Sequence, residues 1–138
     1  MDIVNIFSQL NYGLVIIAAL IHYGLGWLWY SDKMFAKEWI QDNGFSGHEL
    51  KNMGDHKTML MGFVAQFVLV ASLAALIGPA STLKAGVNTA LFVSIGIIAA
   101  TALMNHVYSL KPWRLYLINT GFSVAALVIA GAIIGMWG

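Results

Sequence analysis

The 138-residue chain is 59% hydrophobic and only 9% charged, whereas soluble domains carry about 25% charged residues. Its mean hydropathy is +0.77, and a chain this short cannot bury that much apolar surface in water, since it hides only roughly two-thirds of its unfolded surface. The net charge of +1 excludes the basic stripe of a nucleic-acid-binding protein, and the lack of cysteine excludes disulfides and thiolate zinc sites.

Four segments are long and apolar enough to cross a bilayer, which takes about 20 residues. They cover residues 11–30, 58–77, 87–110 and 115–137, and none of them contains Lys, Arg, Asp or Glu. The chain is therefore predicted to be an all-α integral membrane protein with four transmembrane helices in a single membrane domain. Four crossings place both termini on the same side of the membrane.

The orientation follows from the basic residues. Residues 31–57, which link the first two spans, hold four lysines, and residues 111–114, which link the last two, hold Lys111 and Arg114. The opposite side holds only Lys84. Because basic residues accumulate in cytoplasmic loops, both termini are expected to be non-cytoplasmic. We expect the membrane to be a bacterial inner membrane.

The link between the first two spans is predicted to contain a short interfacial helix in the first cytoplasmic loop. Ser31 and Asp32 form a helix start and Gly44 a stop. Phe35 and Trp39 lie four residues apart on one face, and lysines occupy much of the remaining surface. Such a helix would lie in the headgroup layer, near anionic lipid. The alternative is a soluble loop with scattered aromatic residues.

Helix caps mark the neighbouring boundaries. Ser46 and Glu49 have the spacing of a capping box, and Gly54 would end the helix that this box starts. Asp55 is expected to cap the second span with its carboxylate, and Thr82 or its neighbour Ser81 to cap the third. These signals predict a second short helix in the link and sharp starts for both spans.

Two sequence motifs lie beside the predicted cytoplasmic loops. The first is the run Gly26-Trp27-Leu28-Trp29-Tyr30-Ser31, followed by Phe35, Lys37 and Trp39, and the second is Trp113-Arg114-Leu115-Tyr116-Leu117-Ile118-Asn119. Together with the four-span plan, they resemble domain-of-unknown-function family 1761 over nearly the whole chain. The resemblance implies a small four-span bacterial membrane protein, and the family has no established activity to carry over.

The first motif also has a mechanical interpretation. Trp29 and Tyr30 fall at the inner boundary of the first span, where amphipathic rings prefer the headgroup level. Gly26 would let another helix approach closely. Gly26, Trp29, Tyr30, Phe35 and Trp39 are therefore expected to form an interfacial anchor, and the alternative is an aromatic pair that faces a ligand.

Polar residues within the spans are the candidate functional residues, because each costs free energy in hydrocarbon unless it has a partner. At about 1.5 Å per residue, four of them lie at roughly equal depth from the cytoplasmic side, and three lie nearer that side. This polar intramembrane layer comprises His22, Gln66, Thr101 and Ser123, with Asn105, His106 and Asn119 in the lower band.

Three interpretations of the layer remain open. The side chains could satisfy one another across a packed bundle, with His22 bonded to Gln66 or to water. His22 and His106 could line a substrate or proton pathway, since histidine titrates near neutrality. A catalytic or metal site is the third possibility, although two histidines without an intramembrane carboxylate are a poor metal-ligand set. We predict no metal, no cofactor and no catalytic residue.

Gly131 and Gly135 form a GxxxG motif, a signal for close helix packing within the chain or between subunits. Four helices enclose little room for a solute, so a pathway would form more easily in a homo-oligomer. The leading prediction is a transport or permeation component whose partners are the lipid bilayer and further copies of the chain. A structural or partner-binding membrane module is the alternative, and a membrane-embedded lipid-modifying enzyme is the third.

Overall fold

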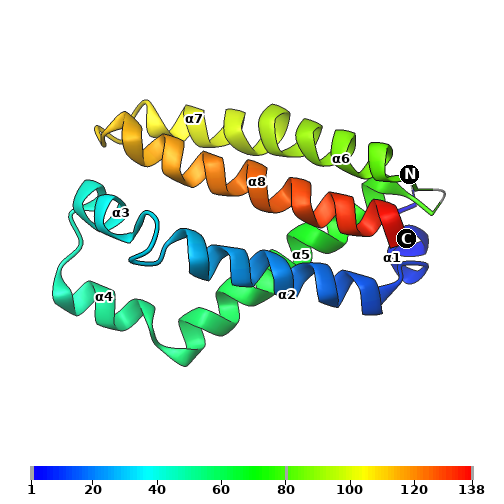
Figure 1. Cartoon of the computed structure of the whole chain (residues 1–138), viewed down its shortest axis with the longest axis horizontal. Helices are drawn as coiled ribbons and strands as arrows, with labels where there is room; N and C mark the ends of the chain where they lie inside the picture. The colour runs from blue at the N-terminus through cyan, green and yellow to red at the C-terminus, as the bar shows by residue number, and fades with distance from the viewer. Residues whose placement is uncertain (1, 80, 138) are drawn as a thin grey trace.

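The computed structural model describes residues 2–79 and 81–137, and it is helical over most of these ranges, with no strand in them. The helices pack lengthwise into one bundle (Figure 1). In chain order they are α1 (Ile3–Ser8), α2 (Tyr12–Trp29), α3 (Ala36–Asn43), α4 (Gly47–Met53), α5 (His56–Ile77), α6 (Leu83–Leu91), the π-helix η1 (Phe92–Ala99), α7 (Ala100–His106) and α8 (Trp113–Trp137).

Four helical stretches are long and apolar enough to span a membrane, which confirms the predicted fold class. They are Tyr12–Trp29, His56–Ile77, Leu83–His106 and Trp113–Trp137. The third begins and ends four residues earlier than the sequence predicts. Its start is fixed by Thr82, whose hydroxyl accepts a hydrogen bond of 3.1 Å from the backbone nitrogen of Ala85.

Helix α8 is the centre of the bundle and contacts α2, α5, α6 and η1. The core beside it is built largely from small and branched side chains, among them Ala19, Ala74 and Leu127. Large apolar side chains point outward instead, as Phe92 does with 71% of its surface exposed. Small residues inside and large apolar residues outside are typical of a bundle whose outer surface faces lipid.

The tightest helix contact joins α6 to α8. A Cβ atom added to Gly86 would lie 2.0 Å from the carbonyl oxygen of Gly131 and 3.1 Å from the Cα of Gly135. Gly131 and Gly135 therefore pack against another helix of the same chain, and in the monomer α6 covers their face. A contact between subunits would need a different surface.

The third span changes its hydrogen-bonding pattern halfway along. After α6 it continues as the π-helix η1 over eight residues and then as α7. A π-helix widens the turn and shifts the side chains that follow around the helix axis. The α6 end of this span thus packs closely on α8, while the α7 end encloses a groove with it.

Helix α3 starts later than predicted. Its first residue is Ala36, and Phe35 occupies the N-cap position without a side-chain hydrogen bond. Ser31 does not start this helix because its hydroxyl donates to the carbonyl oxygen of Leu28, at 2.6 Å, and so closes the end of α2. The predicted stop is confirmed: Gly44 has a φ of 72°, a conformation that favours glycine.

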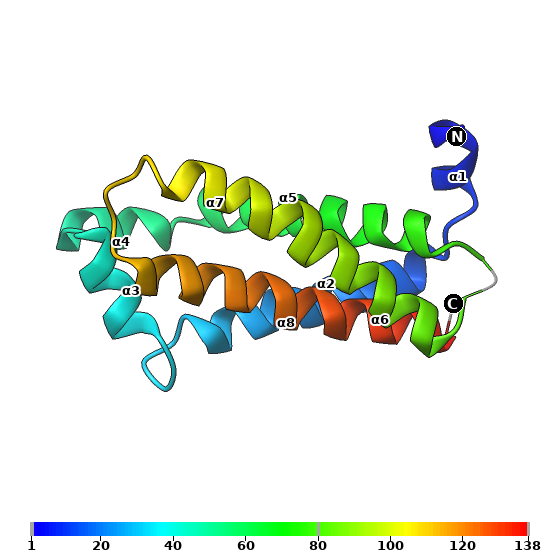
Figure 2. The ribbon, with the colours of Figure 1, turned by 90° about the horizontal axis from the view of Figure 1, so that it is seen from above.

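The remaining short helices frame the two ends of the bundle. The capping box predicted for α4 is confirmed by bonds of 3.2 and 3.1 Å between Ser46 and Glu49. Asp55 takes the N-cap position of α5, but its carboxylate makes no cap bond in the structure, so that part of the prediction is wrong. Helix α1, which was not predicted, lies at the opposite end from α3, where it contacts α5 and Phe7 packs against the core (Figure 2).

Candidate functional site

The two aromatic motifs meet at the end of the bundle that carries α3. The indole nitrogen of Trp29 donates to the carbonyl oxygen of Ile118 at 2.9 Å, and the hydroxyl of Tyr30 donates to Oδ1 of Asn119 at 2.7 Å. The end of α2 is therefore bonded to the first turns of α8. A Cβ atom on Gly121 would lie 3.1 Å from the Trp29 ring, so the glycine makes room for it.

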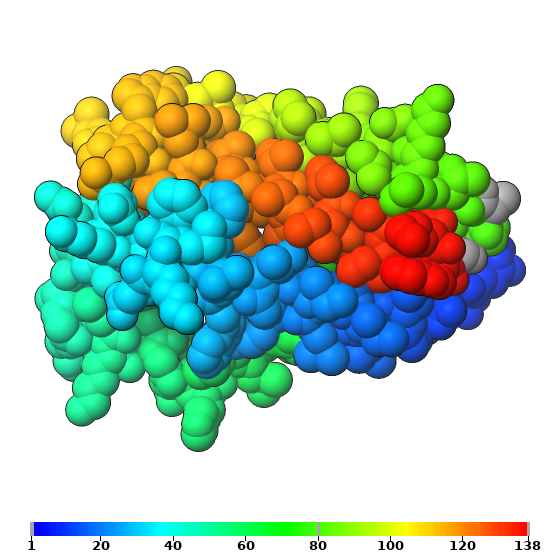
Figure 3. Space-filling model, in the orientation of Figure 1, coloured from blue at the N-terminus to red at the C-terminus, as the bar shows by residue number. Residues whose placement is uncertain are grey.

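The aromatic side chains of α3 and of its N-cap residue pack on this junction. The Phe35 ring lies 5.0 Å from that of Trp29, and the Trp39 ring lies 5.3 Å from that of Tyr30, measured between centroids. The apolar face of α3 is thus satisfied by protein contacts. In the space-filling view this segment lies across the ends of α2 and α8 (Figure 3). That α3 also lies in the headgroup layer stays a prediction.

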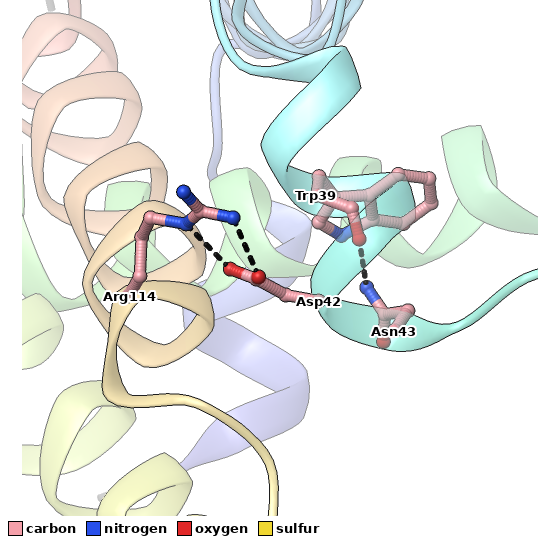
Figure 4. Close-up of polar contacts among 4 residues, drawn as sticks. All are labelled: Trp39, Asp42, Asn43 and Arg114. Carbon is pink, nitrogen blue, oxygen red and sulfur yellow. Dashed lines mark hydrogen bonds and ion pairs between the residues drawn. The ribbon is translucent and has the colours of Figure 1, made fainter.

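An ion pair fastens α3 to α8. Nε and Nη2 of Arg114 donate to the two carboxylate oxygens of Asp42 at 2.8 and 2.7 Å, in a fork geometry (Figure 4). The Asp42 side chain is only 6% exposed. Its hydrogen bond with Arg114 holds the pKa of the Asp42 carboxyl below its usual value of 3.8. Next to this pair, Nζ of Lys111 donates to the carbonyl oxygen of Asn43 at 2.9 Å.

A polar groove opens between α7 and α8 beside this junction, with a volume of about 350 Å³. We call it the α7–α8 groove. It reaches from the end of the spans to Ser123, ten residues into α8, which is about 15 Å of helix. Its lining residues are Asn43, Ala102, Asn105, His106, Ser109, Lys111, Leu115, Tyr116, Asn119, Thr120 and Ser123.

His106 forms one wall of the groove within an aromatic group. Its ring lies 4.8 Å from that of Trp113 and 5.4 Å from that of Tyr116. The Tyr116 hydroxyl donates to the carbonyl oxygen of Ala99 at 2.9 Å, which joins the aromatic group to the end of η1. Nε2 of His106 is buried and has no hydrogen-bond partner among the described residues.

His22 and Gln66 form a separate pair on the other side of α8. Nδ1 of His22 lies 2.6 Å from Oε1 of Gln66, and His22 is only 2% exposed. The ring of Phe122 stands edge-on to the imidazole, 5.2 Å away between centroids. The contact predicted from equal depth is therefore present, and the histidine faces the interior of the bundle.

A family model described as "Protein of unknown function (DUF1761)" matches residues 14–135. The chain belongs to the DUF1761 family. No curated protein and no solved structure matches it. The matched region contains most of α2, the helices from α3 to α7 and nearly all of α8, and with them both aromatic motifs, the α7–α8 groove and the His22–Gln66 pair.

In this DUF1761 chain the predicted polar layer separates into two groups. Four of its residues, Asn105, His106, Asn119 and Ser123, line the α7–α8 groove. His22 and Gln66 instead pair between α2 and α5. Thr101 joins neither group, because it is exposed on the outer surface and its hydroxyl donates to the carbonyl oxygen of Ile97 at 2.6 Å. Equal depth places residues at one level without bringing them to one point.

Several residues of this site do not stand out in the sequence. Thr120 lines the groove with a buried hydroxyl that has no partner in the described part of the chain, yet it follows Asn119 without any motif of its own. Asp42 and Arg114 lie 72 positions apart, so that no local spacing indicates their pairing. Helical spacing does place Asn119 and Ser123 on one face, and this face includes the groove side of α8.

A second hollow, of about 320 Å³, lies at the α1 end. Its lining residues come from α1, α2 and α5, from the segments that follow α1 and α5, and from Ile134 of α8, and most of them are apolar. Among the described residues, no group of three His, Asp or Glu side chains lies close enough to hold a metal ion. The α7–α8 groove is therefore the candidate site, because it combines a hollow with a cation, a histidine and several amides and hydroxyls.

Proposed function

We propose that this protein is a small membrane transport or permeation component whose solute enters through the α7–α8 groove. The observation that carries the proposal is the groove itself, a hollow of about 350 Å³ lined by polar side chains within helices that are otherwise apolar. Polar groups at this depth are costly in lipid and mark solute pathways in many membrane proteins.

In the described part of the chain, the groove does not continue through the bundle. Beyond the groove, α6 and α8 touch at Gly86 and Gly131, and the core around Leu73 and Leu127 is fully buried. We therefore propose a homo-oligomer in which the path runs between copies. The outer face of the third span supports this arrangement, because Gly96 and Ala100 are small, exposed and four residues apart.

The α3 end is proposed to face the cytoplasm. Six of the seven basic residues lie in the parts of the chain at this end, in residues 31–57 and 111–114. The groove would then open toward the cytoplasmic surface, and both termini would be non-cytoplasmic.

Flux through purified protein in lipid vesicles tests the proposal. Osmotic shrinkage is followed with four probes, namely glycerol, urea, potassium chloride and potassium phosphate. At least one probe should cross faster than in protein-free vesicles. Ser123→Leu, which fills the groove, should return that flux to the protein-free level, whereas the control Thr101→Leu, on the outer surface, should leave it unchanged.

Two results would contradict the proposal: no probe crosses faster with protein, or Ser123→Leu conducts like the unmodified chain. The first result would favour the alternative function of a structural or partner-binding module. A specific observation supports that alternative, since the polar groups of the aromatic junction and of the Asp42–Arg114 pair bond to partners within the chain.

A further inference from the structure

The α7–α8 groove holds more hydrogen-bond donors than the chain itself uses. Nζ of Lys111 carries three N–H donors, and one of them donates to the carbonyl oxygen of Asn43. The amide oxygen of Asn119 accepts from Tyr30, which leaves the two N–H donors of the same amide for another partner. The buried hydroxyl of Thr120 has no partner in the described structure.

The charged side chains that line the groove have one sign. Its lining residues include Lys111 and contain no carboxylate in the described part of the chain. Asp42 is next in sequence to the lining residue Asn43, and Arg114 donates to both of its carboxylate oxygens. The lysine charge is therefore not neutralised by an acidic side chain of the lining, and an anion entering the groove would meet a cation and free donors.

From this arrangement we propose that the α7–α8 groove binds an anionic oxygen-rich group of the phosphate type. Lys111 would supply the opposite charge, and Asn119 and Thr120 would donate hydrogen bonds to its oxygens. Ala102 and Leu115 provide an apolar wall for a chain attached to that group. This proposal rests on the proposed function, because it takes the groove as the solute site and adds the chemical class of the solute.

Two sources could present this chemistry. The groove opens at the end of the spans, where the headgroups of a lipid leaflet lie, so a phosphate on a membrane lipid could enter from the side. A free phosphate could enter from water. Both would use Lys111, Asn119 and Thr120, and they differ only in whether an acyl chain follows along the apolar wall.

The test measures thermal unfolding of the full chain in a neutral detergent. The anionic probes are sodium phosphate and dihexanoyl phosphatidylglycerol, and the controls are sodium chloride at equal ionic strength and zwitterionic dihexanoyl phosphatidylcholine. A ligand that binds the folded state raises the Tm in proportion to its occupancy. At least one anionic probe should raise the Tm above both controls.

Two matched pairs of variants locate the binding. Lys111→Gln should weaken the apparent affinity by about tenfold or more, as expected for loss of a charged hydrogen bond, while Lys51→Gln in α4 should leave it unchanged. Thr120→Val removes the unpaired hydroxyl at constant shape and should also weaken binding, and Thr101→Val should not. Because the Thr120 hydroxyl has no partner, its loss should leave the Tm without ligand nearly unchanged, so weaker binding cannot be attributed to misfolding.

A response to phosphatidylglycerol alone would support the inference with a lipid as source, and a response to phosphate would support it with a free anion as source. The inference is overturned if neither anion raises the Tm above the controls, or if Lys111→Gln responds like the unmodified chain. Flux of glycerol or urea that Ser123→Leu blocks, without anion binding, would overturn this inference and leave the proposed function standing. Anion binding without flux of any probe would overturn the proposed transport function and leave the anion site standing.

Discussion

At Gly86 a side chain of any size would collide with the backbone of α8. An added Cβ would lie 2.0 Å from the Gly131 carbonyl oxygen, a distance that requires the two helices to move apart. Gly86→Ala should therefore lower the free energy of unfolding in detergent by about 1–3 kcal/mol, the usual range for overpacking. The control is Gly62→Ala in α5, whose added Cβ meets nothing within 4 Å and should not lower the stability.

Equal stability of the two alanine variants would mean that α6 and α8 are not in close contact. The GxxxG spacing of Gly131 and Gly135 predicts that some helix approaches closely, and it leaves open which one. The partner residue Gly86 lies four residues before Ala90, so α6 also carries a small-xxx-small spacing on the face that meets Gly131. Both sides of the contact therefore have a spacing signal, and which two spans meet depends on how the spans are arranged.

The His22–Gln66 pair makes a second prediction for single residues. Hydrogen bonds inside membranes contribute about 0.6 kcal/mol on average, so His22→Leu and Gln66→Leu should each destabilise the bundle modestly. The double variant should lose less than the sum of the two single losses, by about 0.6 kcal/mol. A double-mutant cycle of unfolding free energies measures this coupling, and strictly additive losses would show that the two side chains are not bonded.

This pairing could be predicted from the sequence because depth along two spans can be counted from their ends. The same counting places Thr101 and Ser123 at the level of His22, yet Thr101 lies outside and Ser123 lines the groove. Which way a polar residue points depends on the rotation of its helix. In the third span that rotation is altered by η1, and the apolar sequence of η1 is equally compatible with an α-helix.

Among the elements, α3 shows where local signals compete. Its stop at Gly44 could be predicted because a left-handed conformation favours glycine. Its start could not, because the hydroxyl of Ser31 serves the preceding helix by bonding to the carbonyl oxygen of Leu28. Its aromatic residues predicted a face in the headgroup layer, and the structure places the rings of Phe35 and Trp39 beside those of Trp29 and Tyr30 at the end of α2.

The attachment of α3 should depend on pH through Asp42. Arg114 holds the pKa of this carboxyl below its usual value, so the ion pair favours the ionised form of Asp42 when α3 is packed against α8. The stabilisation is fully present above the usual carboxyl pKa and is lost as the pH falls through the lowered one. Hydrogen exchange of residues 36–43 should thus be slow at pH 6 and faster, after correction for intrinsic rates, near pH 3.

Asp42→Asn should mimic the acidic state at pH 6 and raise exchange in α3, because a neutral amide cannot form the charged fork with Arg114. Asp32→Asn, which neutralises an exposed carboxylate before α3, is the matched control and should exchange like the unmodified chain. If Asp42→Asn leaves exchange unchanged, the aromatic contacts of Phe35 and Trp39 hold α3 without help from the ion pair.

For the whole molecule, the distribution of basic residues predicts the orientation. A cysteine at Lys51 should react with a membrane-impermeant reagent only from the cytoplasmic side, and a cysteine at Asn5 only from the other side. A reporter fused after Gly138, which lies outside the described residues, should also be non-cytoplasmic. Reaction of Asn5→Cys from the cytoplasmic side would contradict the orientation argument, since six of seven basic residues would then face outward.

The four-helix plan could be predicted almost completely, because length and composition are sufficient to identify a membrane span. The arrangement of the spans could not: the closeness of α6 to α8 and the groove beside α7 arise from Gly86 and from the π-helix, and neither produces a pattern in the hydropathy. The candidate site was predicted in part, through Asn105, His106, Asn119 and Ser123, while Lys111 and Thr120 joined it only in three dimensions.

We propose above all that the α7–α8 groove is a water-accessible site inside an otherwise apolar bundle. The chain has no cysteine, so single cysteines can be introduced at Ser123, at Lys111 and at Thr101 without background. In lipid vesicles, a charged thiol reagent applied from the α3 side should modify Lys111→Cys at the mouth and Ser123→Cys deep in the groove, and should not modify Thr101→Cys on the outer surface. Modification of Lys111→Cys with no modification of Ser123→Cys would show that the groove is closed to water and would contradict the proposed solute site.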